Sequence, residues 1–91
     1  MTMLEIFESK LPEGVKVIKA KEKPSKWDVE ISDGVSTTNT SILKAYAPNA
    51  YDHAAESIML SVMASLAFNR GDIEGMKKWL DKSHKHAEKE I

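Results

Sequence analysis

One segment of this chain, Ala54–Asn69, is apolar around almost its whole circumference when it is wound into an α-helix. Apart from Glu56, its polar positions before Asn69 are small: Ser57, Ser61 and Ser65 recur every four residues and form one narrow stripe. A helix at a protein surface normally shows a broad polar face. The rest of the chain therefore has to cover this helix on nearly every side.

The chain opens with the pattern of a short helix over residues 3–11. Thr2 and Glu5 have the spacing of a capping box, in which each side chain satisfies a backbone N–H at the helix start. Leu4, Phe7 and Leu11 recur at helical intervals, and Pro12 then interrupts the pattern.

From Val15 onward the apolar period changes to two, which predicts strands. Val15 and Val17 alternate with lysines, as at a protected sheet edge, and Trp27, Val29 and Ile31 alternate with charged residues. Asp33-Gly34 predicts a hairpin turn after the second of these strands. Residues 35–40 are rich in Val and Thr, so the antiparallel meander has two or three strands.

The second half of the chain predicts two helices. Ser41 is placed to cap a short helical turn, and Pro48 suits the first turn of a main helix over residues 48–69. Gly71 suits the left-handed position after that helix, and Asp72 caps the next one. The second helix carries a narrow apolar seam, formed by Ile73, Met76, Leu80, Ser83 and Ala87.

The short link between these helices predicts an antiparallel helical hairpin packed on the sheet. The predicted fold class is therefore α+β, in a single domain over residues 1–91: a short N-terminal helix, the meander and the C-terminal hairpin.

The meander and the other helices offer apolar surface for only part of the main helix, which predicts self-association. We expect a homo-oligomer, with a dimer in which main helices pair across a two-fold axis as the first choice. The alternative is that the sheet and two helices cover the main helix by themselves. The expected interface residues are Ser57, Ser61, Met63, Ser65 and Phe68.

Composition limits the function classes. The formal net charge is −1 and Arg70 is the only arginine, so the chain has no overall attraction for nucleic acid. It contains no cysteine, which excludes disulfides and thiolate chemistry. The apolar helix is too short to span a membrane, and the first residues lack the basic start of a signal peptide. We expect a cytoplasmic protein without a membrane partner.

Little in the sequence predicts catalysis. His84 and His86 lie two residues apart, so on a helix they point in different directions and are expected to be surface residues that do not share a metal. His53, near the start of the main helix, is expected to be structural or exposed. No nucleotide-binding, hydrolase or metalloprotease motif occurs. We therefore expect no enzyme activity, no cofactor and no metal.

Lysines 16, 19, 21, 23 and 26 surround one hairpin beside Trp27, a combination that can contact nucleic acid. Lysines of this kind also protect edge strands from aggregation, and Glu22, Asp28 and Glu30 dilute the charge. Nucleic acid is therefore the lesser expectation as a partner.

Polar and aromatic side chains collect instead before and at the start of the main helix. Free N–H groups at a helix start favour anions such as phosphate. Ordinary turn and capping roles are the alternative explanation for each residue. The candidate ligand- or partner-binding residues are Thr38, Asn39, Lys44, Tyr46, Asn49, Tyr51 and His53.

Two short stretches resemble a phage small-protein family: Ser32-Asp33-Gly34 after a strand, and Pro48-Asn49-Ala50-Tyr51-Asp52 at the start of a long helix. Some relatives in that family are oligomeric sponges for the nucleotide immune signals of bacteria. The resemblance implies an anti-defence accessory factor of a phage or mobile element.

Three hypotheses follow. The first is a non-catalytic binding protein that inhibits a host protein or defence complex by direct contact. The second is an oligomeric sponge that sequesters a small phosphorylated ligand or nucleotide signal, and the third is a small regulator that binds nucleic acid.

Overall fold

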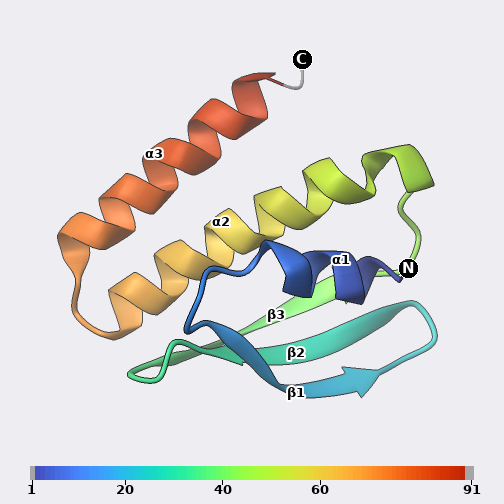
Figure 1. Ribbon diagram of the computed structural model, residues 1–91, viewed down its shortest axis with the longest axis horizontal. Coiled ribbons are helices and arrows are strands. Elements are labelled where there is room, and N and C mark those ends of the chain that lie inside the picture. Colours follow the sequence, from blue (N-terminus) through green and yellow to red (C-terminus); the bar gives the residue numbers. More distant parts are fainter. Residues whose placement is uncertain (1, 90–91) are drawn as a thin grey trace.

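The protein forms two layers, a three-stranded sheet and helices that cover one of its faces (Figure 1). The structure is a computed structural model and describes residues 2–89. In chain order the elements are α1 (Met3–Lys10), β1 (Lys16–Glu22), β2 (Lys26–Ser32), β3 (Thr37–Leu43), the 3₁₀ turn η1 (Pro48–Ala50), α2 (Tyr51–Asn69) and α3 (Ile73–Lys89). The predicted α+β architecture is confirmed, with the third strand present.

Helix α1 starts as the sequence predicts. The Thr2 hydroxyl accepts a hydrogen bond from the Glu5 N–H, and the Glu5 carboxylate accepts one from the Thr2 N–H, which completes the capping box. The Thr2 N–H, helped by the Thr2 hydroxyl, holds the pKa of the Glu5 carboxylate below its usual range. The inner side of the helix carries Met3 and Phe7, which are 2% and 0% exposed. α1 therefore closes one side of the core.

The strands pair in the order β1-β2-β3, all antiparallel. The predicted turn at Asp33 and Gly34 joins β2 to β3: the Asp33 N–H donates to the Ser36 carbonyl over 3.2 Å, and Gly34 has φ of 91°. A side chain is strained at that φ, which explains glycine there. The Asp33 carboxylate also accepts from the N–H groups of Val35 and Ser36, which fixes the turn.

The expected helical turn that begins at Ser41 is wrong. β3 continues to Leu43, which pairs with Lys26, and the Ser41 hydroxyl donates to Asp28 on the neighbouring strand over 2.9 Å. Ile42 is fully buried against the core. Pairing with the whole length of β2 and the burial of Ile42 outweigh the local capping preference of a serine.

Helix α2 ends in the arrangement that Gly71 predicts. The Gly71 N–H donates to the Phe68 carbonyl and the Asp72 N–H to the Ala67 carbonyl, a Schellman motif, with Gly71 at φ of 84°. Asp72 then caps α3, because its carboxylate accepts from the Gly75 N–H at 2.9 Å. That bond is the main reason why the pKa of Asp72 lies below its usual range. The chain reverses within a few residues, and α2 and α3 pack antiparallel.

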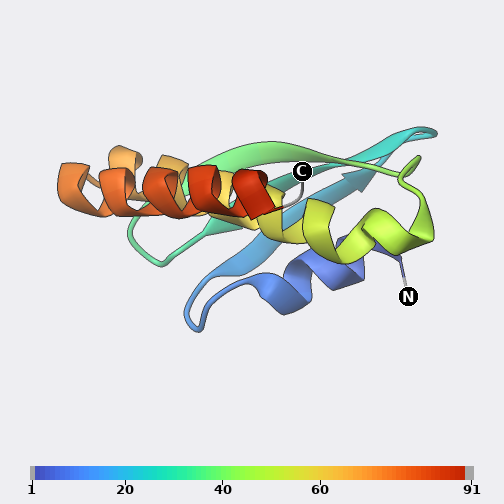
Figure 2. The same cartoon turned by 90° about the horizontal axis from the view of Figure 1, so that it is seen from above.

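Helix α3 lies along α2, outside the sheet and on the side of α2 away from α1, as Figures 1 and 2 show. Its half-buried residues include Gly75, Met76, Trp79, Ser83 and His86. Two residues of the predicted seam, Ile73 and Leu80, are 42% and 41% exposed. The seam is thus rotated from its predicted position, because Trp79 packs against the core and His86 stacks on His53 of α2, and neither residue belongs to the predicted seam.

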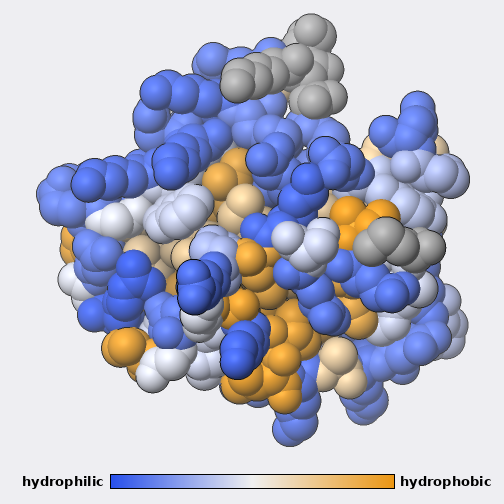
Figure 3. Space-filling view, in the orientation of Figure 1, coloured by the Kyte–Doolittle hydropathy of each residue, from blue (hydrophilic) through white to orange (hydrophobic). Residues whose placement is uncertain are grey.

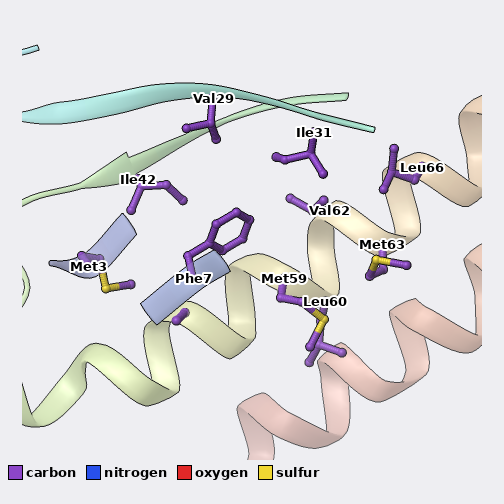
Figure 4. Close-up of a cluster of buried hydrophobic side chains, with 11 residues drawn as sticks. Met3, Phe7, Val29, Ile31, Ile42, Met59, Leu60, Val62, Met63 and Leu66 are labelled. Atoms are coloured by element: carbon purple, nitrogen blue, oxygen red, sulfur yellow. The ribbon is translucent and has the colours of Figure 1, made fainter. Parts of the chain in front are cut away.

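The core lies between the sheet and α2, with α1 at its margin (Figure 4). Val29, Ile31 and Ile42 come from the sheet, and Met59, Val62 and Leu66 come from α2. Burial of each large side chain of this kind stabilises the fold by about 2 kcal/mol. The chain therefore covers most of α2 by itself, and of the apolar segment 54–69 the exposed positions are Ser61, Ser65, Phe68 and Asn69.

The molecule measures 34 × 32 × 19 Å, the dimensions of a slab. Figure 3 shows the face that carries α1, where the surface over α3 is hydrophilic and apolar surface gathers below α1. Among the described residues, no helix has the length and hydropathy that crossing a bilayer requires.

Candidate binding groove beside helix α2

A groove of about 400 Å³ runs along the one side of α2 that neither α1 nor the core of the sheet covers. α2 forms its floor, β3 contributes at one side and α3 forms the other. The residues that line the groove are Thr38, Ser61, Ala64, Ser65, Phe68, Asn69, Met76 and Leu80. None of these side chains carries a charge.

The floor is low because the exposed residues there are small. Ser61 and Ser65 lie one helical turn apart, and Ala64 between them is buried. Phe68 and Leu80 stand higher, at 57% and 41% exposed. Small residues between large apolar ones form a concave apolar surface, which is the usual shape of a binding site.

Three contacts fix the end of the groove by tying the β2–β3 turn to the end of α2. The Ser36 hydroxyl donates to the Leu66 carbonyl over 2.9 Å, and the Asn69 amide donates to the Thr37 carbonyl over 2.8 Å. Arg70 donates to Asp33 over 2.7 Å and to Asp72 over 3.1 Å. Polar contacts thus join the β3 side of the groove to its floor on α2.

Asp33 is the centre of this connection, with its side chain 9% exposed. Burial acts to raise its pKa, but the N–H groups of Ser36 and Val35 and the Arg70 guanidinium outweigh burial and lower the pKa to about 2. The carboxylate is therefore charged at neutral pH and holds Arg70 beside the turn.

The expected interface residues divide between the groove and the core. Ser61, Ser65 and Phe68 line the groove, and Ser57 is half-buried. Met63 is only 5% exposed and belongs to the core, so it offers no surface to a partner. The core takes Met63 because the helix turns this residue away from the serine stripe.

The expected ligand-binding residues do not meet in one place. Thr38 lines the groove, whereas Asn39 lies on the opposite, open face of the sheet. Lys44 is bound to Glu22 at 2.7 Å and lies 4.9 Å from the centre of the Trp27 ring. The ion pair with Lys44 lowers the pKa of Glu22.

The other members of that set lie around the start of α2. Tyr46 and Tyr51 are half-buried against the core, and Asn49 is exposed on η1. The ring of His53 stacks on that of His86, with centroids 4.2 Å apart. These aromatic groups therefore serve packing contacts within the protein.

The role of His86 was missed, and the expectation that it is a surface residue is wrong. Its side chain is 13% exposed, its Nδ1 lies 3.0 Å from Glu56 and its Nε2 lies 3.2 Å from the His53 carbonyl. Its contact with His53 follows from the antiparallel hairpin, in which residues at nearly equal distances along the chain from Arg70 face one another. Counting outward from the turn would have found this pair.

The open face of the sheet has a broad depression of about 660 Å³ with mixed charges, including Lys19, Lys21, Asp28 and Glu30. Lys23 binds Asp28 at 2.6 Å, and this bond, with help from Ser41, lowers the pKa of Asp28 to about 2. Lysines of the predicted basic hairpin are thus partly neutralised by neighbouring acids.

No group of three or more His, Asp or Glu side chains within residues 2–89 is placed to hold a metal ion. Comparison with known protein families, with curated proteins and with solved structures finds no match to this chain.

Proposed function

We propose that this chain is a small non-catalytic binding protein that acts by direct contact with another protein through the groove on α2. The observation that carries the proposal is the exposure of Phe68 and Leu80 around the small residues Ser61 and Ser65. The groove is uncharged and concave, and a protein partner would remove its apolar side chains from water.

Two other expectations from the sequence, a dimer through α2 and a site for a phosphorylated ligand, make different demands on the structure. A dimer through the body of α2 would have to use the same strip, because residues 53–67 are buried or half-buried apart from Ser61 and Ser65. A phosphorylated ligand would need the residues between Thr38 and His53 to converge, and they lie in separate places. The groove therefore favours a protein partner over a small ligand.

The resemblance of residues 32–34 and 48–52 to a phage small-protein family suggests where that partner is to be sought. On this proposal the chain is an accessory factor that binds a bacterial host protein or defence complex. This part of the proposal rests on the resemblance alone.

Affinity capture from bacterial lysate tests the proposal with a matched pair of variants. Ser65→Arg places a long cation in the groove at an exposed position of α2. Ser9→Arg makes the same change at an exposed position of α1, away from the groove, and is the control. We expect a protein that wild type and Ser9→Arg retain, and that Ser65→Arg loses about tenfold or more. Equal recovery on all three baits would contradict a function at the groove.

A further inference from the structure

Within residues 2–89, no strand pairs with the outer edge of β3, which leaves the main-chain groups on that side without a partner strand. The Asp33 N–H donates to Ser36 and the Lys44 N–H donates to Ser25, so even-numbered residues from 36 to 44 face β2. The odd-numbered residues, among them Asn39 and Ser41, direct their N–H and C=O groups away from the sheet. In the part of the chain that the structure describes, the hydrogen bond to this edge comes from Asn69, at the Thr37 carbonyl.

The other edge of the same sheet is protected. β1 carries Lys16, Lys19 and Lys21, and its register shifts between Val17 and Lys19. Lysines and bulges are the devices by which edge strands avoid pairing with other chains. The sequence of β3, TTNTSIL, has neither a charge nor a proline, and its pairing with β2 has no such shift.

The groove lies directly beside this unprotected edge. Thr38 of β3 lines it together with Ser61, Ser65 and Phe68 of α2. A strand added to β3 would direct every second side chain toward α2 and the others toward the open face of the sheet. The groove accepts uncharged, apolar side chains because none of its lining residues is charged.

We propose that the occupant of the groove is an extended segment of a partner protein, which adds to the sheet as a fourth strand beside β3. The segment is uncharged, with apolar side chains at alternate positions that enter the groove between Ser65, Phe68 and Leu80. This inference rests on the proposed function, since it names the kind of partner segment that the groove takes.

The unpaired edge favours such a segment over a second copy of the whole chain. An antiparallel pairing of two β3 edges around a two-fold axis perpendicular to the sheet keeps both sets of helices on one face. Because α2 and α3 lie beyond β3 in Figure 1, on the side away from β1, this pairing brings the helices of the two copies toward each other. A single extended segment brings no such bulk and still satisfies the main-chain groups.

A displayed library of random peptides of about ten residues, the length of a long strand, is the probe. We expect selection on the full chain to enrich uncharged peptides with apolar residues at every second position. Synthetic copies labelled with a fluorophore then give affinities by polarisation. Enrichment at helical intervals, or no enrichment, would overturn the proposal.

Two proline variants separate edge pairing from simple groove filling. Asn39→Pro removes one outward N–H from β3 without removing a bond to β2, and Ala20→Pro does the same on β1. We expect Asn39→Pro to weaken the selected peptides by about tenfold and Ala20→Pro to leave them within about twofold. Circular dichroism of both variants checks that the sheet is retained.

Ser65→Arg completes the design, because it blocks the groove and leaves the edge in place. Loss of binding in Ser65→Arg with full binding in Asn39→Pro overturns strand addition but keeps the groove as a binding site. Binding unaffected by either variant overturns both proposals. Light scattering that shows a wild-type dimer, and a monomer for Ser65→Arg, assigns the groove to a second copy and also overturns strand addition.

Discussion

Asp33 is the residue at which charge and local geometry meet. Its pKa of about 2 lies below the usual value for an aspartate, so the carboxylate stabilises the fold when it is ionised. This contribution is complete above about pH 4, where the unfolded chain is also ionised, and it is lost as the pH falls toward 2.

The variant Asp33→Asn tests this contribution. It keeps a side-chain oxygen that can accept from the N–H groups of the turn, but it removes the charge that holds Arg70. We expect it to lower the free energy of unfolding by about 2 kcal/mol at pH 7, with the difference from wild type shrinking between pH 4 and pH 2. Urea unfolding at several pH values measures this. A difference that is constant over that range would mean that the charge of Asp33 has no role.

Phe7 is the second residue with a specific prediction. Phe7 is fully buried. Together with Met3 it forms the buried side of α1, which packs against α2. We expect Phe7→Ala to destabilise the protein by about 3 to 5 kcal/mol, because it leaves a cavity under α1. Thermal unfolding gives the measurement, and Glu8→Ala on the exposed side of the same helix is the control.

At the residue scale the sequence predicted well where the cause is local. The capping box at Thr2, the turn at Gly34 and the helix end at Gly71 follow from backbone geometry within a few residues, and all are present. Met63 and His86 were misplaced although helical geometry was enough to place them, since Met63 lies two residues from both Ser61 and Ser65, and His86 faces His53 across the hairpin. Helical spacing tells which residues share a face but leaves open what that face meets.

Among the elements, α3 depends most on a single neighbour. It packs on α2, which also contacts α1 and β3. Local opening of α3 therefore breaks fewer packed contacts than opening of α2. We expect amide hydrogens of α3 to exchange faster than those of the middle of α2, by native-state hydrogen exchange with mass spectrometry. Equal protection of both helices would mean that the hairpin opens as one unit.

The helices and strands were largely predictable, because the spacing of apolar residues changes clearly from every second residue in the strands to every three or four residues in the helices. The exception is β3, whose uncharged polar residues carry no clear period and whose end was taken for a helical turn. Its length is set by pairing with β2 as far as Lys26. Pairing of this kind depends on the partner strand, so the strand's own residues could not reveal it.

The groove was partly visible in the sequence for a physical reason. The serine stripe at residues 57, 61 and 65 identified the side of α2 that could lie open, and two of these serines line the groove. The predicted meander places any third strand at an edge of the sheet, but whether residues 35–40 form that strand was left open, so the free edge of β3 was not identified.

For the whole molecule, the two tryptophans report on opposite parts of one cooperative unit. Trp27 lies on the sheet and Trp79 on α3. In the variant Trp79→Phe, tryptophan fluorescence reports on Trp27 alone. We expect the urea midpoint of this variant to be the same whether unfolding is followed by Trp27 fluorescence or by circular dichroism of the helices. Midpoints that differ would divide the chain into two folding units.

The contacts between the β2–β3 turn and the end of α2 also order events on the ribosome. Ser36, Thr37 and Asp33 are separated from their partners by 30, 32 and 37 residues along the chain. At about 5 to 20 residues per second, the turn leaves the exit tunnel about 2 to 7 seconds before those partners are available. During that interval the uncharged β3 strand is newly made and α2 is not yet beside it, so its outer edge is open to neighbouring chains while the lysines of β1 protect only the opposite edge.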